Sequence, residues 1–321
     1  MTVRWGILST ARINRKFLDG LAGSSDGEAV AVASRDADRA AAYARERGIP
    51  RAYGSYDELL ADPEIDAVYI SLPNAPHLEW SRRALEAGKH VLCEKPLSAA
   101  PGEVEAAFDV AEREGRLLME AFMYRHHPQT ARLVELVADG AIGRLRLIRA
   151  SFSFPLRDPA DVRLSRDLAG GALMDVGCYC VNAARLLGGE AEQVNAFQMI
   201  GGDGVDIVFV GSMRFPHTVL AHFDAGFRLA ARHDLEVVGE DGTLYVSDPW
   251  HCVSPGIDLR RADGVERIEI PAANPYTLEA DNFAAAIRGE APPLLGRADA
   301  VDQARTIEAL YGAAAGGPSV R

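Results

Sequence analysis

The sequence predicts a two-part α/β protein, with a doubly wound parallel sheet followed by an α+β domain that has a large open, mostly antiparallel sheet. In the first third, short apolar runs alternate with amphipathic stretches, which is the pattern of βαβ units. After about residue 125, strand-like runs follow one another without helical crossovers, as in antiparallel sheets. A chain of 321 residues also suits about two domains. We expect the domains to be residues 1–123 and 124–321.

The first part is expected to alternate strands with helices. Its strands are expected at residues 3–8, 29–34, 67–72, 90–93 and 117–120, and its helices at 13–21, 37–47, 56–60, 77–87 and 103–114. Gly48 and Gly88 end two of these helices, because glycine readily takes the left-handed conformation at a helix end. Sheets of this kind bind ligands beyond the carboxyl ends of their strands, so the site is expected there.

The second part is expected to consist mainly of consecutive strands. After a helix at 130–138, the strands are expected at 145–154, 193–199, 206–213, 218–224, 234–238, 242–246 and 267–270. A helix at 177–187 interrupts them, and helices at 276–288 and 298–314 close the chain.

Composition excludes several classes of partner. The 34 basic and 46 acidic residues give a net charge of −12, and nucleic-acid binding needs a basic surface. The four cysteines form no C-x-x-C pair and no histidine cluster has zinc spacing, so free thiols and no metal are expected. No apolar run approaches the ~18 residues of a membrane span. With no signal-peptide pattern, we expect a cytoplasmic protein without a membrane partner.

The turn after the first strand is a candidate site for the pyrophosphate of a dinucleotide. Ser9, Ala11 and Asn14 occupy the three glycine positions of the G-x-G-x-x-G pattern. The motif itself is therefore absent, and an ordinary strand-to-helix turn remains an alternative. Backbone N–H groups at a helix start can still bind phosphate. The expected contacts are Ser9, Thr10, Ala11, Arg12 and Ile13.

The end of the second strand favours NADP over NAD. NAD-binding domains usually place a carboxylate there to bind the ribose 2′-hydroxyl, but this chain has Ser34 and Arg35, with Arg39 one turn later. Asp36 starts the next helix and can serve as its cap. Arg35 can bind a 2′-phosphate with two hydrogen bonds, and its alternative role is that of a solvated surface residue.

Several segments together carry a family resemblance. They are Ile7 to Ile13, Pro73-Asn74-Ala75-Pro76-His77, Glu94-Lys95-Pro96, Glu120 to Pro128 and Asn282 to Gly289. With these, nearly the whole chain resembles the Gfo/Idh/MocA oxidoreductase family, in particular its branch of NADP-dependent D-xylose dehydrogenases and dimeric dihydrodiol dehydrogenases.

The resemblance implies a Rossmann domain and a C-terminal domain whose sheet forms a homodimer or homotetramer. It also implies that the loops after two strands line the cofactor cleft, through Leu72, Pro73, Asn74, His77, Glu94 and Lys95. Purely structural roles remain open for two of them: Asn74 as a helix cap and His77 as a first-turn residue.

The resemblance places the catalytic residues at Lys95, Asp175 and Tyr179. Where the family often has a histidine, this chain has Tyr179, as in the dihydrodiol and xylose dehydrogenase branch. A tyrosine with a pKa of about 10 can donate a proton, and the ammonium of Lys95 would lower that pKa. Asp175 would orient Lys95 or bind a substrate hydroxyl. The expected substrate contacts are Lys95, Tyr124, Arg125, Arg163, Asp175 and Tyr179, with Arg157 and Arg166 in the same loop as Arg163.

These residues predict an NADP(H)-dependent oxidoreductase that moves a hydride between nicotinamide and a sugar CH–OH or C=O group, with an aldopyranose such as D-xylose as substrate. No catalytic metal is expected, because hydride chemistry belongs to the cofactor. A keto-sugar reductase, a trans-dihydrodiol or inositol dehydrogenase, and a cofactor-binding sensor without turnover remain alternatives. The prediction requires Lys95 and Tyr179 to meet over the nicotinamide ring.

Overall fold

The computed structural model describes residues 2–316, which form two compact units. Unit 1 contains residues up to 126 together with residues 274–301, and unit 2 contains residues 127–273 and the chain from residue 302. Residues 274–301 therefore belong to unit 1. The domain boundary expected from the sequence, after residue 123, assigns them to the second domain. That expected boundary stays a prediction.

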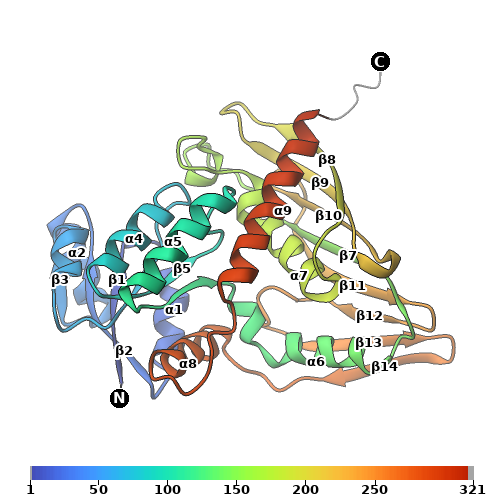
Figure 1. Cartoon of the computed structure of the whole chain (residues 1–321), viewed down its shortest axis with the longest axis horizontal. Coiled ribbons are helices and arrows are strands. Elements are labelled where there is room, and N and C mark those ends of the chain that lie inside the picture. The colour runs from blue at the N-terminus through green and yellow to red at the C-terminus, as the bar shows by residue number, and fades with distance from the viewer. Residues whose placement is uncertain (1, 317–321) are drawn as a thin grey trace. The chain divides into compact units, whose positions relative to one another are not determined.

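Unit 1 is built on a six-stranded parallel sheet with the strand order β3-β2-β1-β4-β5-β6. The strands are β1 (Val3–Leu8), β2 (Gly27–Ala33), β3 (Arg51–Tyr53), β4 (Ala67–Ile70), β5 (His90–Glu94) and β6 (Leu118–Ala121). The helices are α1 (Asn14–Leu21), α2 (Ala37–Arg47), α3 (Tyr56–Leu60), α4 (His77–Glu86), α5 (Pro101–Glu114) and α8 (Pro275–Ile287), with a short 3₁₀ turn η1 (Met123–His126). The order reverses between β1 and β4, which is where a doubly wound sheet binds its ligand. In Figure 1, α4 and α5 lie side by side.

Helix α8 completes unit 1 although it lies far along the chain. It packs against α1 and η1, and Phe283 contacts Trp5 with 5.6 Å between ring centroids. Gly20 on α1 allows this approach, since a Cβ there would lie 2.5 Å from the Cβ of Tyr276. The ring of Phe17, on the same helix, stacks on Tyr69 at 3.9 Å.

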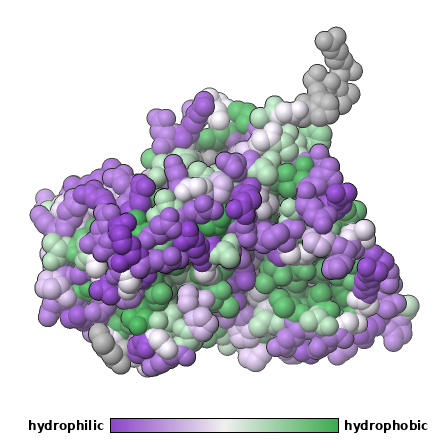
Figure 2. All heavy atoms as spheres, in the orientation of Figure 1, coloured by the Kyte–Doolittle hydropathy of each residue, from purple (hydrophilic) through white to green (hydrophobic). Residues whose placement is uncertain are grey.

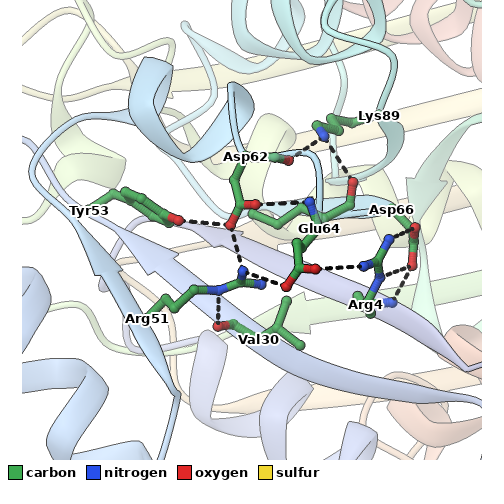
Figure 3. Close-up of polar contacts among 9 residues, drawn as sticks. Arg4, Val30, Arg51, Tyr53, Asp62, Glu64, Asp66 and Lys89 are labelled. Atoms are coloured by element: carbon green, nitrogen blue, oxygen red, sulfur yellow. Dashed lines mark hydrogen bonds and ion pairs between the residues drawn. The ribbon is translucent and has the colours of Figure 1, made fainter.

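A polar network joins the amino-terminal ends of the strands of unit 1 (Figure 3). Arg4 pairs with Asp66 at 2.8 Å, and Arg51 pairs with Asp62 at 3.0 Å. Lys89 donates to the backbone carbonyl of Asp62 at 2.6 Å. These residues lie at the opposite ends of the strands from the predicted binding edge, so the network stabilises the sheet without entering the site.

Unit 2 is built on an eight-stranded sheet with the order β14-β13-β12-β11-β7-β10-β9-β8. Its strands are β7 (Leu145–Ser153), β8 (Gln193–Ile200), β9 (Asp206–Arg214), β10 (Leu220–Gly226), β11 (Arg232–Gly239), β12 (Thr243–Val246), β13 (Gly256–Arg261) and β14 (Gly264–Glu269). Its helices are α6 (Pro128–Ala138) and α7 (Cys178–Gly188), with the 3₁₀ turns η2 (Val162–Leu164) and η4 (Pro216–Thr218) and a π-helical turn, η3 (Leu173–Gly177); α9 (Arg297–Gly316) carries residues of both units. Only β7 and β10 pair in parallel among the described strands of this sheet. The fold class expected from the sequence is confirmed.

The two faces of this second sheet differ in burial. Helix α7 packs on β7 and β10, and inward side chains such as Phe209 and Phe223 are buried. On β8, β9 and β10, apolar side chains also point outward: Phe197, Met199, Val210 and Leu220 are between 45% and 64% exposed. Figure 2 shows hydrophobic groups (green) among mainly hydrophilic ones on the face displayed. In the described part of the chain, no helix has the length and apolarity needed to cross a membrane.

Candidate cofactor and catalytic site

The β1–α1 turn is held by its own side chains where a classical dinucleotide loop has glycines. Ser9 adopts a φ of 116°, a region that glycine enters more easily. Its hydroxyl lies 2.8 Å from that of Ser71 and accepts the N–H of Ala11 at 3.1 Å. Asn14 donates to the Ser9 carbonyl at 2.9 Å. The N-cap residue of α1, Ile13, makes no side-chain capping hydrogen bond, which suits a helix end that binds an anion.

Two arginines lie at the end of β2, and the nearby carboxylate is engaged elsewhere. Asp36 is the N-cap of α2 and accepts the backbone N–H of Arg39 at 2.9 Å, which is the capping role left open by the sequence. Burial raises the pKa of Tyr56, while the adjacent charges of Arg35 and Arg39 act in the opposite direction. Both guanidinium groups therefore lie near one hydroxyl. This arrangement favours a bound phosphate over a ribose hydroxyl.

His77 links the two loops that follow β4 and β5. Its ring is buried, with Nδ1 2.9 Å from the Pro96 carbonyl oxygen and Nε2 2.8 Å from that of Leu72. A neutral imidazole has one N–H, so it can donate to only one of these carbonyls, whereas an imidazolium donates to both. Burial lowers the pKa of His77, against the effect of the two carbonyls, and the charge of Lys95 lowers it further. The first-turn role of His77 is thus observed.

Asn74 lies just before this helix, whose N-cap residue is Pro76. The Asn74 backbone carbonyl accepts the backbone N–H of His77 at 3.1 Å. The two roles considered for Asn74, in the cofactor cleft and as a helix cap, stay predictions. Leu72, Pro73 and Asn74 are all half-buried in the loop that leaves β4.

The backbone around Lys95 is fixed by two buried carboxylates. Glu94 ends β5 and accepts the hydroxyl of Tyr69 at 2.5 Å. Glu120 on β6 accepts the backbone N–H of Leu97 at 2.8 Å. Lys95 itself is half-buried. The lysine predicted to contact the reacting oxygen thus follows a well-anchored strand end at the carboxyl edge of the sheet.

The two substrate candidates of η1 are differently placed. Tyr124 is buried, with its ring perpendicular to that of Phe122. Arg125 lies 3.6 Å from Asp299, which belongs to the same unit. A substrate contact of Arg125 would therefore have to share this guanidinium with an ion pair.

In unit 2, the structure brings Arg163 and Asp175 together. Arg163 Nε donates to the Asp175 carboxylate at 2.7 Å, and Arg163 Nη1 lies 3.2 Å from Asp161. The charges of Asp175 and Asp161 raise the pKa of Arg163. Arg157 and Arg166 lie in the same polar segment but are not part of this pair among the contacts described.

Tyr179 lies in the first turn of α7 within an aromatic cluster. It is 7% exposed, and its ring centroid lies 5.5 Å from Phe152 and 5.9 Å from Trp250. The sequence pattern predicts an α-helix from residue 177, whereas a π-helical turn that contains Asp175 precedes α7, which begins at Cys178. Such turns are frequent at functional sites.

Asp206 and Tyr311 support this turn and were missed by the sequence analysis. Asp206 accepts the backbone N–H of Leu173 at 2.7 Å and the hydroxyl of Tyr311 at 2.9 Å. Burial raises the pKa of Asp206 in spite of these bonds. Gly171 has a φ of 123°, and a Cβ on it would lie 2.3 Å from Asp206. The paired glycines before the turn were the available signal.

Two family models match the chain. Residues 3–122 match the GFO_IDH_MocA model, described as an oxidoreductase family with an NAD-binding Rossmann fold, and residues 130–245 match the GFO/IDH/MocA C-terminal domain. The chain belongs to the Gfo/Idh/MocA oxidoreductase family. The family expected from the sequence motifs, and with it the assignment to the oxidoreductases, is confirmed.

Individual relatives cover nearly the whole chain. It is 43% identical to D-xylose 1-dehydrogenase (NADP(+)) 2 of Haloferax volcanii over 98% of each chain. It is 35% identical to trans-1,2-dihydrobenzene-1,2-diol dehydrogenase of Danio rerio, covering 86% of this chain and 82% of the relative. The solved structure of a 3-ketoreductase from Actinomadura kijaniata, in complex with NADP and TDP-benzene, aligns with a TM-score of 0.92 at 33% identity over 98% of each chain.

Proposed function

We propose that this oxidoreductase uses NADP(H) and transfers a hydride between nicotinamide and a CH–OH or C=O group of a sugar, with an aldopyranose such as D-xylose as the substrate. The observation that carries the cofactor choice is the end of β2, where Arg35 and Arg39 lie near one hydroxyl and Asp36 is engaged as a helix cap. The identity of 43% to a D-xylose 1-dehydrogenase named for NADP(+) supports the substrate class.

The residues at the carboxyl edge of the first sheet fit this cofactor. The β1–α1 turn, Ser9 to Ile13, would hold the pyrophosphate through backbone N–H groups, and Ser34, Arg35 and Arg39 would bind the 2′-phosphate. The loops after β4 and β5, from Leu72 to His77 and at Glu94 and Lys95, would border the nicotinamide. The bound cofactor supplies the hydride chemistry.

The chain's own residues would manage the proton. Oxidation of an alcohol needs a base for the hydroxyl proton, and reduction needs an acid for the developing alkoxide. Tyr179 is assigned this role, and its buried ring is held by Phe152 and Trp250. Lys95 would lower the pKa of Tyr179 and bind the reacting oxygen. Asp175, paired with Arg163, would bind or orient a substrate hydroxyl, with Tyr124 and Arg125 as further contacts.

A keto-sugar reductase is the second candidate, because the solved relative with a TM-score of 0.92 is a 3-ketoreductase. In a keto-sugar reductase, the same residues of this chain would serve the reaction in the direction of reduction. Dihydrodiol and inositol substrates need no other catalytic group and are included in the test. Cofactor binding without turnover on any of these substrates would indicate a sensor.

We also propose that the protein is a homo-oligomer of the cytoplasm. The outward apolar side chains of β8, β9 and β10 support a homodimer or homotetramer formed through the second sheet. The four cysteines are buried and form no disulfide with one another, which suits a reducing cytoplasm.

A substrate panel tests the proposed activity. The purified enzyme is given NADP⁺ or NAD⁺ with D-xylose, other aldoses, an inositol and a trans-dihydrodiol, and NADPH with keto-sugars, while reduced nicotinamide is followed by absorbance. We expect NADP⁺-dependent oxidation of an aldopyranose. Turnover only with keto-sugars favours the reductase. NADP⁺ binding without turnover on any substrate contradicts the proposal and favours the sensor.

A further inference from the structure

Two histidines and an aspartate of unit 2 converge from separate elements. His233 lies on β11, while Asp248 and His251 lie in the segment that follows β12. Their side-chain ligand atoms all lie within 4.8 Å of one another, and they form the one such metal-capable group found in the part of the chain described here. The proposed reaction does not use any of the three.

Asp248 is already fixed in a geometry suited to a ligand. Its carboxylate accepts the backbone N–H groups of Val253 at 2.7 Å, His251 at 3.2 Å and Ser254 at 3.3 Å. Backbone donors that orient a carboxylate in this way are typical of the surroundings of metal ligands.

The ring of His251 lies at a distance from this carboxylate that suits two ligands of one metal ion. Its Nδ1 lies 3.6 Å from Asp248 Oδ1, close to the ~3.4 Å between two donors of a tetrahedral zinc site with bonds of ~2.1 Å. The ring stands perpendicular to those of Phe152 and His233, with centroids 5.5 and 5.6 Å away. His233 is half-buried, and its ligand atom already lies within 4.8 Å of those of the other two residues.

We propose that His233, Asp248 and His251 bind one divalent transition-metal ion, with Zn²⁺ as the best-matched class. Two imidazoles and one carboxylate are a donor set that Zn²⁺ accepts, with a fourth position left to water. The hard cations Mg²⁺ and Ca²⁺ prefer oxygen donors alone.

The ion would join β11 to the segment after β12 and stiffen one wall of the aromatic cluster. Phe152 contacts both His251 and Tyr179, so the ion would lie one ring away from Tyr179. Its effect is therefore structural support within unit 2, and it takes no part in the hydride transfer.

Metal titration tests this site independently of the proposed reaction. The full-length protein is stripped with a chelator and titrated calorimetrically with Zn²⁺, and Co²⁺ is added separately to record its visible absorption. We expect one ion per chain and a Co²⁺ spectrum of a low-coordinate N/O site. His233→Ala and His251→Ala should each lower the affinity about tenfold or more. His222→Ala, which removes an exposed histidine of β10, should leave it unchanged.

A folding control keeps the result decisive. Thermal unfolding should show that Zn²⁺ raises the Tm of the wild type and of His222→Ala but not of His233→Ala, which lacks one of the three ligands. The absence of Zn²⁺ binding to the wild type overturns the proposal. Binding that both His233→Ala and His251→Ala leave unchanged also overturns it, because the ion would then occupy other surface groups.

Discussion

Tyr179 and Lys95 are the residues on which turnover should depend. Tyr179→Phe removes the hydroxyl that exchanges the proton, and Lys95→Ala removes the ammonium beside the reacting oxygen. We expect each change to lower kcat by about 10²- to 10⁴-fold, measured by steady-state kinetics, with NADP⁺ binding retained in a fluorescence titration. Wild-type rates in both variants would contradict the assignment of the site.

Arg35 should set the preference for NADP⁺. Arg35→Ala removes a charge-assisted bond to the 2′-phosphate worth about 1.5–3 kcal/mol, so the KM for NADP⁺ should rise about tenfold or more while the KM for NAD⁺ changes little. Arg45→Ala is the matched control, since Arg45 is an exposed arginine in the last turn of α2, the helix that follows Arg35. An unchanged ratio of the two KM values would remove Arg35 from the cofactor site.

His77 should act by positioning the loop that carries Lys95. His77→Gln replaces the rigid ring that lies between the two carbonyl oxygens with a flexible side chain, and a small displacement of a catalytic group can lower rates about 10²-fold. We expect kcat to fall more than the affinity for NADP⁺. His90→Gln is the control. His90 starts β5, the strand that leads to Lys95, and its Nδ1 accepts the backbone N–H of Leu117. Equal losses in the two variants would indicate general destabilisation instead.

At the scale of single elements, the π-helical turn before α7 depends on Gly171. Gly171→Ala places a Cβ 2.3 Å from Asp206 at a φ of 123°, whereas Gly189→Ala meets a φ of 89° with no atom within 4 Å. Both variants carry backbone strain, but only the first also crowds a buried carboxylate. We expect Gly171→Ala to lose about 1–3 kcal/mol more free energy of unfolding, measured by urea denaturation. Equal losses would show that Asp206 moves freely.

Most elements could be predicted from apolar periodicity, and the exceptions have local causes. The strand at residues 3–8 was expected with the bounds it has, and the helix at 37–47 likewise. Strand β3 has only three residues, too few to show alternation. Strand β13 alternates buried Ile257 and Leu259 with polar neighbours, but turn-forming residues before it and charged residues after it obscured the pattern.

The site was predictable where its residues follow one another in sequence. The β1–α1 turn and the capping role of Asp36 depend on local chain geometry. The two carbonyl partners of His77 come from loops after different strands, so they depend on the tertiary fold. His233 and Asp248 are fifteen residues apart in sequence, and no local spacing connects them. The meeting of Lys95 and Tyr179 stays a prediction.

At the scale of the whole molecule, the outward face of the second sheet should mediate assembly. Val210 is exposed and pairs with exposed Phe197 across β8 and β9. Light scattering should give a homodimer or homotetramer for the wild type, and Val210→Arg should lower the mass, because a charge in an apolar interface is costly. Val265→Arg changes an equally apolar, exposed valine on β14 and should leave the mass unchanged. A monomeric wild type would refute this assembly.

The return of α8 to the first sheet has a consequence for biosynthesis. The Rossmann-type core receives Phe283 and Tyr276 from a segment translated well after its last strand. While the nascent polypeptide is still being elongated, Trp5 and Gly20 lack the helix that covers them. Folding of this unit therefore cannot finish before residues 275–287 have left the ribosome, and until then part of its apolar core stays uncovered.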